Sequence, residues 1–375
     1  MTATGVTEAA GVLRAEVRAW LEANPHPSGA QLAERGLVAP HWPTPWGLGA
    51  DAASQLVIDE ELRRAGARRP VNPIGIGWAG PTLLEGGTAE QQARWLPGIL
   101  SGAQFWCQLF SEPDAGSDLA SLRTRAVRDG DEWVVNGSKI WTSYAHVASY
   151  GILLARTDPD AEAHQGISYF VCPMDLAGIE VRPVIDMTGD HAFNEVFFSD
   201  VRIPADHLVG EPNRGWRLAK VTLGNERVSL SGEGALWGRG PTAADLVARS
   251  RGQALRPLQR DALVRVWSEG KVLSLLRDRL VAAALRGRPP GPEASVRKAL
   301  ADDHGQHVMG LAKDLAGTAG ALVGTGPFGQ RGATGAEWSH GFLYAQALTI
   351  GGGTSAVQRN IVAERVLGLP RDPTG

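Results

Sequence analysis

Helical periodicity dominates the first part of the chain, from residue 1 to about residue 104. Apolar residues recur at the spacing of one helical face from Leu13 to Leu21. Asn24-Pro25 then ends this helix, because the residue before a proline disfavours helical dihedral angles. A long helix is predicted to begin near Asp51, and Thr88 to Gln91 form the capping-box pattern of a further helix.

Between residue 105 and about residue 206 the pattern changes to a period of two. Short runs of β-branched and aromatic residues are separated there by turn residues at regular spacing, which predicts strands. The runs are residues 105–110, 122–128, 132–135, 138–141, 149–155, 167–173, 179–184 and 194–201. We expect them to form a small antiparallel barrel or sandwich.

The helical period returns from residue 207 to residue 375. Helices are predicted to start near Arg214, Gln259, Glu293, Ala336 and Thr354, and one of them has a core-facing stripe made of Val266, Leu273, Leu276 and Leu280. The order of helices, strands and helices predicts an α+β fold. It would consist of an N-terminal helical domain (1–104), a middle antiparallel β domain (105–206) and a C-terminal four-helix bundle (207–375).

Residues 105–143 combine a buried strand, a polar turn and a hairpin. The apolar run 105–110 leads into residues 111–118, whose short polar side chains and backbone N–H groups suit phosphate or flavin edges. Two turn signals follow, at residues 129–131 and at Asn136-Gly137, and the second predicts a tight hairpin turn between two strands. Considered alone, this stretch is also compatible with a plain hairpin of a β-rich domain.

Composition narrows the class of protein. The net charge is -3 over 375 residues, so nothing points to nucleic acid or to a membrane surface as a partner. The 2 cysteines, Cys107 and Cys172, lie in apolar runs, and two cysteines cannot form a disulfide framework or a metal cluster. No apolar run is long enough to span a membrane, and the first residues lack a signal-peptide pattern. We therefore expect a cytoplasmic protein without a metal site.

Four sets of motif residues, taken in order along the chain, resemble the acyl-CoA dehydrogenase family of flavoproteins. They are Ser111-Glu112-Pro113 with Ala115-Gly116-Ser117-Asp118; Asn136-Gly137 with Lys139-Ile140-Trp141-Thr142-Ser143; Phe193-Asn194-Glu195-Val196-Phe197-Phe198 through Val201-Arg202-Ile203-Pro204; and Gly353-Thr354-Ser355-Ala356-Val357-Gln358-Arg359-Asn360 with Ala363-Glu364-Arg365. The resemblance implies FAD as cofactor, an acyl-CoA or other acyl thioester as substrate, and a trans-2,3 double bond in the product. It also implies electron-transfer flavoprotein as a partner and a homotetramer or homodimer.

The reaction implied by this resemblance needs a carboxylate that removes the α-proton of the thioester while the β-hydrogen leaves as hydride. The enzyme must also stabilise the charge that develops on the thioester oxygen and exclude water from the carboxylate. In much of the family this Glu precedes a Gly-Thr pair near the C-terminus, where the present chain has Gly352 before Gly353-Thr354. A second family arrangement places the Glu on an earlier helix, immediately before an Arg. The resemblance therefore assigns the base to Glu226 and a supporting cation to Arg227. The alternative for both is an ordinary surface ion pair.

The resemblance also assigns residues to the cofactor and to the substrate. Gln108, Leu109, Phe110 and Ser111 would pass the isoalloxazine ring, Trp141 would stack beside it, and Thr142 and Ser143 would contact it near N5. Thr354, Ser355 and Ala356 open a helix whose N–H groups suit a flavin or phosphate oxygen. Ser117, Leu223 and Gly353 would face the acyl thioester. The alternatives are a cross-strand aromatic near Trp133 for Trp141, a polar turn residue for Ser117 and a simple N-cap for Thr354.

The chain also departs from the family pattern. The Arg-x-x-Phe-Gly stretch that reaches the adenine half of FAD in many members is absent around residues 249–257, which leaves the residues that hold that half unassigned. No Gly-x-Gly-x-x-Gly follows a strand, so nicotinamide binding is unsupported. Two other functions remain open: a different flavin redox enzyme on the same scaffold, such as an oxidase, an N-hydroxylase or a dehydrogenase of carrier-protein-bound acyl groups, and a non-catalytic subunit of a mixed oligomer.

Overall fold

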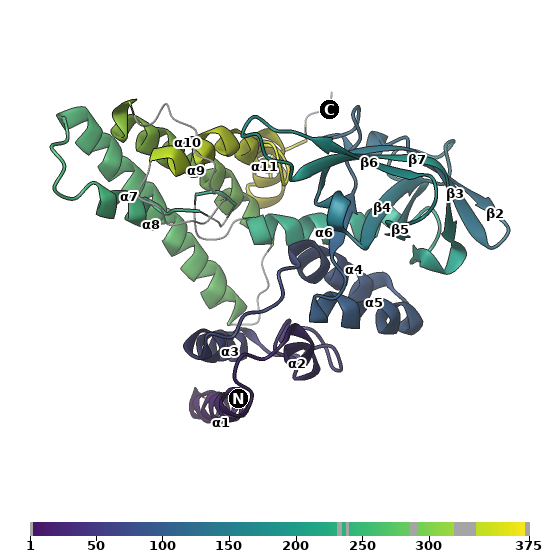
Figure 1. The fold of residues 1–375 in the computed structure, drawn as a ribbon, viewed down its shortest axis with the longest axis horizontal. Coiled ribbons are helices and arrows are strands. Elements are labelled where there is room, and N and C mark those ends of the chain that lie inside the picture. Colours follow the sequence, from purple (N-terminus) through teal and green to yellow (C-terminus); the bar gives the residue numbers. More distant parts are fainter. Residues whose placement is uncertain (1–2, 231–234, 238–239, 286–290, 319–334, 372–375) are drawn as a thin grey trace. The chain divides into compact units, whose positions relative to one another are not determined.

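The structure, a computed structural model, describes residues 3–230, 235–237, 240–285, 291–318 and 335–371. These residues form two compact units (Figure 1). The first unit comprises Met1–Ile185 and His191–Leu223, and the second comprises Asp186–Asp190 and Gly224–Gly375. The mixed α+β arrangement, with N-terminal helices, a middle sheet and a helical C-terminal part, confirms the fold class predicted from the sequence.

The helices at the start of the first unit are α1 (Ala3–Ala23), α2 (Gly29–Glu34), α3 (Ala52–Ala65), the π-helical turn η1 (Gly75–Ala79), α4 (Gly80–Gly86) and α5 (Ala89–Ser101). Two of them, α3 and α5, begin where the sequence predicted, near Asp51 and at Thr88. The Asp51 side chain accepts a hydrogen bond from the Ser54 N–H at the start of α3. Thr88 and Gln91 form a reciprocal capping box at the start of α5. Each cap satisfies backbone groups that the first helical turn would otherwise leave unpaired.

One sheet forms the middle of the first unit. Its strands are β1 (Trp106–Leu109), β2 (Arg125–Asp129), β3 (Glu132–Ser143), β4 (Tyr150–Arg156), β5 (Ile167–Pro173), β6 (Ile179–Val184), β7 (Phe193–Pro204) and β8 (Leu208–Val209). Within the described residues their order is β6-β7-β3-β2-β4-β5-β8, with β1 paired to β4. Most pairs are antiparallel, but β4 pairs in parallel with both β1 and β2, which the sequence pattern did not predict.

The predicted hairpin turn at Asn136-Gly137 is wrong. The chain turns instead at Gly130, between β2 and β3, and β3 runs without a break through Gly137. A register shift against β7 occurs between Val135 and Gly137, where Gly137 has φ +146°. The Asn136 amide exchanges two hydrogen bonds of 2.9 Å with Asp200 on β7. Two residues of β7, Ser199 and Asp200, therefore face the single residue Asn136, so the Asn-Gly pair lies opposite a β-bulge of β7.

The sheet separates two hydrophobic cores because successive side chains on a strand point to opposite faces. The core on one face consists of side chains from the strands and the segments between them. It includes Leu109 of β1 with Leu153 and Ala155 of β4. Ile152 and Leu154 face the other core, which the N-terminal helices share (Figure 1). That shared core includes Trp42 from the aromatic loop at residues 41–47, so the loop packs as part of the helical domain.

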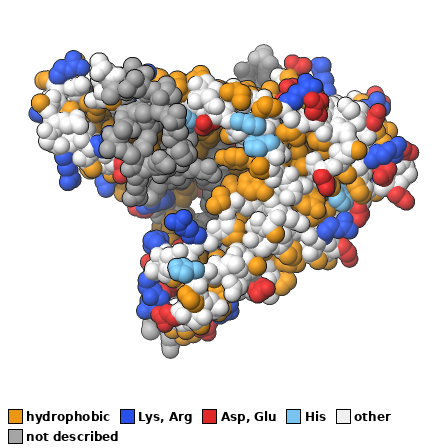
Figure 2. Space-filling model, in the orientation of Figure 1, with side chains coloured by type: hydrophobic (Ala, Val, Ile, Leu, Met, Phe, Trp, Pro, Cys, Tyr) orange, Lys and Arg blue, Asp and Glu red, His pale blue; other side chains and the backbone are white. Residues whose placement is uncertain are grey.

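The second unit is helical in its described part. Its elements are the end of α6 (Gly215–Leu230), then α7 (Ala243–Arg249), α8 (Pro257–Ala284), α9 (Ala294–Leu315), α10 (Gly335–Tyr344), η6 (Ala345–Thr349), α11 (Ser355–Ile361) and η7 (Val362–Val366). Helix α9 contacts α8, α10, η6 and α11, and Val308 and Met309 place its buried face in the core of this unit. The predicted core stripe of α8 is fully buried only at Val266. Acidic and basic side chains both occur on the visible surface (Figure 2).

Candidate functional site

The end of β1 and the second half of β3 lie side by side in the first unit. The Ile140 N–H donates a hydrogen bond of 2.9 Å to the Ser111 carbonyl, which joins the two predicted flavin-binding segments. Leu109 and Phe110 are buried on opposite faces of the sheet, whereas Gln108 and Ser111 are half-buried. We call residues 108–111 and 141–143 the strand-end cluster. The structure therefore brings together the predicted residues of this cluster.

A buried ion pair fixes the geometry of the strand-end cluster. The Lys139 ammonium, which is fully buried, donates to the Glu112 carboxylate at 2.8 Å and to the Phe110 carbonyl at 3.0 Å. Burial lowers the pKa of Lys139 to about 8, although Glu112 acts in the opposite direction. Burial would raise the pKa of Glu112, but Lys139 and the N–H groups of Arg123 and Thr124 outweigh it and hold that pKa below its ordinary value.

Sequence reasoning assigned no role to Lys139 and Glu112, although both belong to the motif residues. Their opposite charges in two segments of the sequence were the available signal. Lys139 of β3 donates to the carbonyl of Phe110, the residue that follows β1, and so connects the two segments. Because removal of one partner would leave a buried charge unpaired, the pair holds the two segments in one register.

Trp141 is presented to solvent by an unusual backbone. Its side chain is 57% exposed and its φ is +59°, a left-handed conformation that bulky residues rarely adopt. Its ring contacts Phe193 edge to face, with centroids 5.9 Å apart. Trp133, by contrast, is buried against Phe170 on the inner face of the sheet. The two tryptophans therefore do not form a cross-strand pair, and the exposed indole face of Trp141 is open to a ligand.

Next to Trp141, Thr142 carries a buried polar atom that lacks a partner. Among the described residues, nothing forms a hydrogen bond with its side-chain oxygen. Its carbonyl is held by the Asn194 amide at 3.0 Å, and the Asn194 oxygen in turn contacts His146 and His191, whose rings stack 4.3 Å apart. A buried hydroxyl without a partner is rare in native proteins, so Thr142 has the properties of a group that meets a ligand.

Glu226 lies in the second half of α6 and is only 8% exposed. This burial argues against an ordinary surface carboxylate. One turn earlier on the helix, the Thr222 hydroxyl lies 2.8 Å from the Thr82 hydroxyl and 3.1 Å from the Tyr169 hydroxyl. These contacts fix the part of α6 that precedes Glu226. Leu223 is half-buried against the core of the first unit. The side chain of Arg227 lies outside the described part of the structure.

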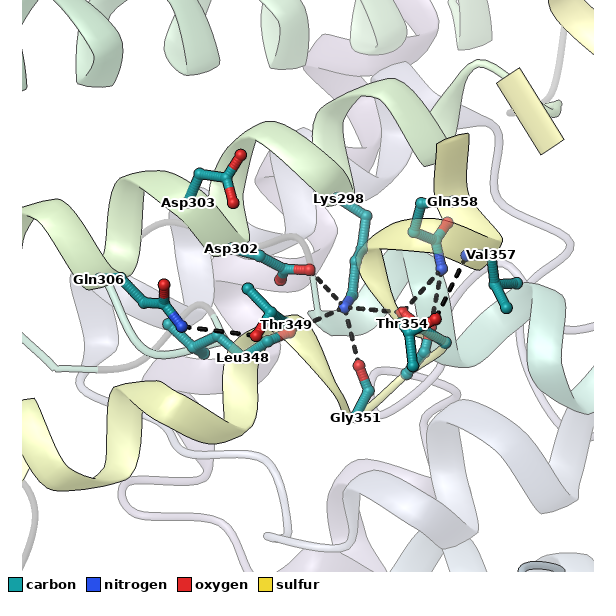
Figure 3. Close-up of polar contacts among 12 residues, drawn as sticks. Lys298, Asp302, Asp303, Gln306, Leu348, Thr349, Gly351, Thr354, Val357 and Gln358 are labelled. Atoms are coloured by element: carbon teal, nitrogen blue, oxygen red, sulfur yellow. Dashed lines mark hydrogen bonds and ion pairs between the residues drawn. The ribbon is translucent and has the colours of Figure 1, made fainter. Parts of the chain in front are cut away.

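The segment before α11, residues 350–354, is a loop that we call the glycine loop. Gly352 and Gly353 have φ values of +67° and +87°, which favour glycine. The Thr354 hydroxyl accepts a hydrogen bond from the Val357 N–H at 3.2 Å, so Thr354 is the N-cap of α11 (Figure 3). The Ser355 hydroxyl oxygen is buried and, among the described residues, has no partner.

The carbonyl groups and the N–H groups of the glycine loop differ in their hydrogen bonding. The carbonyls of Gly351, Gly352 and Gly353 accept hydrogen bonds from the side chains of Lys298 and Gln358. Within the described chain, the N–H groups of Gly352, Gly353 and Thr354 donate no hydrogen bond. A run of free N–H groups, followed by a helix N-terminus, favours a ligand oxygen that carries negative charge.

Ser117 lies apart from these clusters along the chain. It is exposed and precedes the short helical turn η2 (Leu119–Ser121), in the polar turn that the sequence predicted. In the described part of the structure, no group of three or more His, Cys, Asp or Glu side chains could hold a metal ion. Among the described helices, none is long and apolar enough to cross a membrane.

Comparison with known proteins assigns the chain to a family. The acyl-CoA dehydrogenase N-terminal domain matches residues 7–103, the middle domain matches residues 107–201 and the C-terminal domain matches residues 213–367. The chain therefore belongs to the acyl-CoA dehydrogenase family, a class of FAD-dependent oxidoreductases, which confirms the resemblance inferred from its motif residues.

Curated relatives carry the same family name. The chain is 44% identical over 340 residues to the acyl-CoA dehydrogenase FadE34 of Mycobacterium tuberculosis, a match that covers 91% of this chain and 46% of FadE34. It thus spans about half the length of that protein. It is 40% identical over 366 residues to the acyl-CoA dehydrogenase IpdE1 of the same organism, which covers 96% of this chain and 90% of IpdE1.

Two similar solved structures have the same fold over nearly the whole chain. The structure described as the Tcur3481-Tcur3483 steroid ACAD is 33% identical, with a TM-score of 0.78 and 99% coverage of both chains. The ChsE4-ChsE5 complex from Mycobacterium tuberculosis is 32% identical, with a TM-score of 0.76 and coverage of 97% of this chain and 98% of that chain.

Proposed function

We propose that the chain is an FAD-dependent acyl-CoA dehydrogenase that forms a trans-2,3 double bond, with Glu226 as the base that removes the α-proton. The observation that carries this proposal is the burial of Glu226, at 8% exposure, in a chain that has Gly352 at the usual position of the base. Glycine cannot accept a proton. Glu226 stands at the alternative position in the sequence, immediately before an Arg, and its burial fits a base kept from water.

The strand-end cluster and the start of α11 have groups that fit a flavin. The buried hydroxyls of Thr142 and Ser355, which lack a partner among the described residues, would each gain one from the polar edge of the ring system. Trp141 offers an exposed aromatic face for stacking. FAD, when bound, accepts the β-hydrogen as hydride. Gln108, Leu109, Phe110, Ser111 and Ser143 complete the residues that would hold it, together with Thr354 and Ala356.

The remaining need is stabilisation of the thioester oxygen as the α-proton leaves. The free N–H groups of Gly352 and Gly353 can donate to such an oxygen, and backbone donors do not have to reorient as the charge develops. The small size of Gly352 leaves space for the acyl chain. Ser117, Leu223 and Gly353 are proposed to contact the acyl thioester, and Arg227 to support Glu226.

Names of relatives guide the choice of substrate and partners. Because one similar structure is a steroid ACAD at 33% identity, a steroid side-chain acyl-CoA is the substrate class we favour first. Electrons would leave to an electron-transfer flavoprotein. A second function, as one subunit of a mixed oligomer, is favoured by the two-component name of the ChsE4-ChsE5 complex. Burial of Glu226 favours a catalytic chain over an inactive one.

Anaerobic bleaching of the flavin by a panel of acyl-CoAs of differing length, branching and ring content tests the proposal. The wild-type protein should be yellow and should bleach with at least one of them. Glu226→Gln should keep FAD and bind acyl-CoA, while the rate of flavin reduction falls by about 10²–10⁴-fold because the general base is lost. Glu16→Gln, at an exposed position of α1, is the matched control and should react as wild type does.

Reduction of the flavin at the wild-type rate in Glu226→Gln would show that another group takes the proton. The next carboxylate to examine would be Glu233, which lies outside the described residues. A colourless protein that takes up no FAD would contradict the proposal as a whole.

A further inference from the structure

Lys298 of α9 is fully buried and directs its ammonium at the glycine loop (Figure 3). The ammonium donates to the Asp302 carboxylate at 2.6 Å, the Gly351 carbonyl at 2.7 Å, the Leu348 carbonyl at 3.0 Å and the Gly353 carbonyl at 3.2 Å. An ammonium has three N–H groups, so four acceptors around it use every donor. Three of these acceptors are backbone carbonyls: that of Leu348 lies just before the glycine loop, and those of Gly351 and Gly353 lie within it.

Asp302 lies one helical turn after Lys298 and is also buried, at 1% exposure. Burial of a lone lysine would be unfavourable, and the carboxylate compensates for it. Asp302 therefore fixes the ammonium, and the ammonium fixes the loop. Gln358 assists from α11, because its side-chain amide donates to the Gly352 and Gly353 carbonyls at 3.0 and 3.2 Å.

These contacts determine which backbone groups of the glycine loop remain available to a ligand. With the carbonyls of residues 351–353 taken by Lys298 and Gln358, the N–H groups that remain free in the described chain are those of Gly352, Gly353 and Thr354. Left-handed glycines are flexible, so the backbone itself does not hold this arrangement. The side chain of Lys298 supplies the constraint that the glycines lack.

We propose that Lys298, held by Asp302, is a positioning residue that keeps the glycine loop in the conformation which presents its free N–H groups and the start of α11 to flavin and thioester. This inference rests on the proposed function for the identity of the ligands. It goes beyond that function by assigning a role to a buried pair that touches neither ligand. The conformational part, in which the ammonium orders the loop, applies to the protein with or without FAD.

Burial raises the pKa of Asp302 to about 7, although Lys298 acts to lower it. A carboxyl whose pKa is raised in the folded state is disfavoured there in its ionised form, so protonation below pH 7 does not by itself loosen the loop. At pH 8 the ionised Asp302 depends on the ammonium 2.6 Å away, and this contact fixes Lys298.

The first experiment is hydrogen exchange of the flavin-free protein. Lys298→Met keeps the length of the side chain and removes the ammonium. The hydrogen-bonded amides next to the free ones, those of Ile350, Gly351, Val357 and Gln358, should then exchange at least about 10-fold faster, since local opening breaks their hydrogen bonds. Lys313→Met, on the same helix but with its ammonium over the Phe342 ring, is the control and should leave these amides unchanged. Unchanged exchange in a folded Lys298→Met protein would overturn the proposal.

The second experiment measures FAD affinity and flavin reduction. Lys298→Met should bind FAD at least about 10-fold more weakly, and the reduction rate at saturating acyl-CoA should fall by about 10²-fold, since small misplacements of reacting groups are costly. Equal affinity and rate in Lys298→Met and wild type would contradict the positioning role. Wild-type protein that binds no FAD would contradict the proposed function instead, and hydrogen exchange would still test the loop.

Asp302→Asn keeps the inference testable should Lys298→Met not fold. The amide retains an acceptor for Lys298 but does not titrate. At pH 8, where Asp302 of the wild type is ionised, Asp302→Asn leaves the Lys298 ammonium without its counter-charge, so FAD should bind at least about 10-fold more weakly. Equal FAD affinity of a folded Asp302→Asn protein and the wild type would show that the pair does not control the loop.

Discussion

At the scale of single residues, the Thr142 hydroxyl is a candidate for a hydrogen bond with a ligand. It is buried and, among the described residues, makes no hydrogen bond. Thr142→Val has nearly the same shape, so the flavin-free protein should gain about 1 kcal/mol of stability from loss of an unsatisfied group. FAD affinity should fall about 10-fold if the hydroxyl bonds to the cofactor, which corresponds to about 1.4 kcal/mol. Chemical unfolding and flavin fluorescence measure the two effects.

Thr222→Val is the matched control for Thr142→Val. The Thr222 hydroxyl contacts the hydroxyls of Thr82 and Tyr169 and the Leu218 carbonyl. Its removal should destabilise the protein by about 1–3 kcal/mol, because its buried partners lose a hydrogen bond. The two variants are therefore expected to change the stability of the flavin-free protein in opposite directions. A destabilising effect of Thr142→Val on the flavin-free protein would mean that the hydroxyl already has a partner.

Individual residues differed in how well the sequence predicted them. The motifs of Ser111 and Trp141 lie side by side because one sheet joins them, and their contact with flavin stays a prediction. Burial of Glu226 could not be predicted, since a Glu-Arg pair on a helix is most often exposed and only tertiary packing removes it from water. The role of Lys298 was missed for a similar reason: a Lys–Asp pair four residues apart on a helix is most often exposed, and the carbonyls that Lys298 binds lie about fifty residues further along the chain.

At the scale of elements, the close approach of β3 to Thr124 depends on Gly137, which lies beside the β7 bulge. A Cβ atom there would lie 2.6 Å from the Thr124 hydroxyl oxygen, and the residue has φ +146°. Gly137→Ala should therefore destabilise the protein by about 1–3 kcal/mol through backbone strain. Gly310→Ala, in α9, has open space around the added methyl group and should stabilise by about 0.5–1 kcal/mol. Urea denaturation compares them, and a neutral Gly137→Ala would contradict strain at this position.

Contact between α1 and α3 depends on a buried carboxylate. Glu61 accepts hydrogen bonds from Arg18, Arg64 and Arg14, which lower its pKa to about 2, with Arg18 the largest contributor. A carboxylate with a depressed pKa stabilises the folded state above its unfolded pKa, near 4.5, and loses this effect as the pH falls towards 2. The melting temperature should therefore fall steeply between pH 4.5 and pH 2.

Glu61→Gln removes the titrating group from this contact. Its melting temperature should be lower than that of the wild type at pH 7 and should change less between pH 4.5 and pH 2. Parallel melting curves for the two proteins over this range would show that other carboxylates cause acid unfolding.

Helices were predicted more reliably than the strand pairings. Caps at Asp51 and Thr88 are local signals, and the structure has both. The strand at β3 was divided in two because an Asn-Gly pair favours a tight turn but can also lie opposite a β-bulge. Only the partner strand decides between them, and here Asp200 of β7 provides the two hydrogen bonds that keep β3 continuous. The parallel pairing of β4 has no local signal either.

At the scale of the whole molecule, α8 has apolar side chains that are exposed in the described part of the structure. Val264, Trp267, Val272 and Leu275 recur at helical spacing and are 44–63% exposed. An exposed apolar stripe of this kind marks a protein–protein contact, so we expect a homodimer or homotetramer through α8. Light scattering at micromolar concentration should give a mass above that of the 39.8 kDa monomer.

Leu275→Glu should dissociate this oligomer, because it introduces a charge into the apolar stripe. Val71→Glu changes an isolated apolar residue that is 80% exposed, so it should leave the mass unchanged. A monomeric wild-type protein would contradict self-association and would favour a contact with a different chain.

The left-handed backbone at Gly352 also limits how this enzyme could change over generations. A carboxylate placed there by one substitution would meet φ +67°, where a residue with a side chain loses roughly 1–2 kcal/mol. The loop could adopt a right-handed form only by giving up contacts with Lys298 and Gln358. With Glu226 as the proposed base, a carboxylate at residue 352 would therefore combine backbone strain with weakened contacts to Lys298 and Gln358, so the two positions of the base are not exchangeable without cost in this chain.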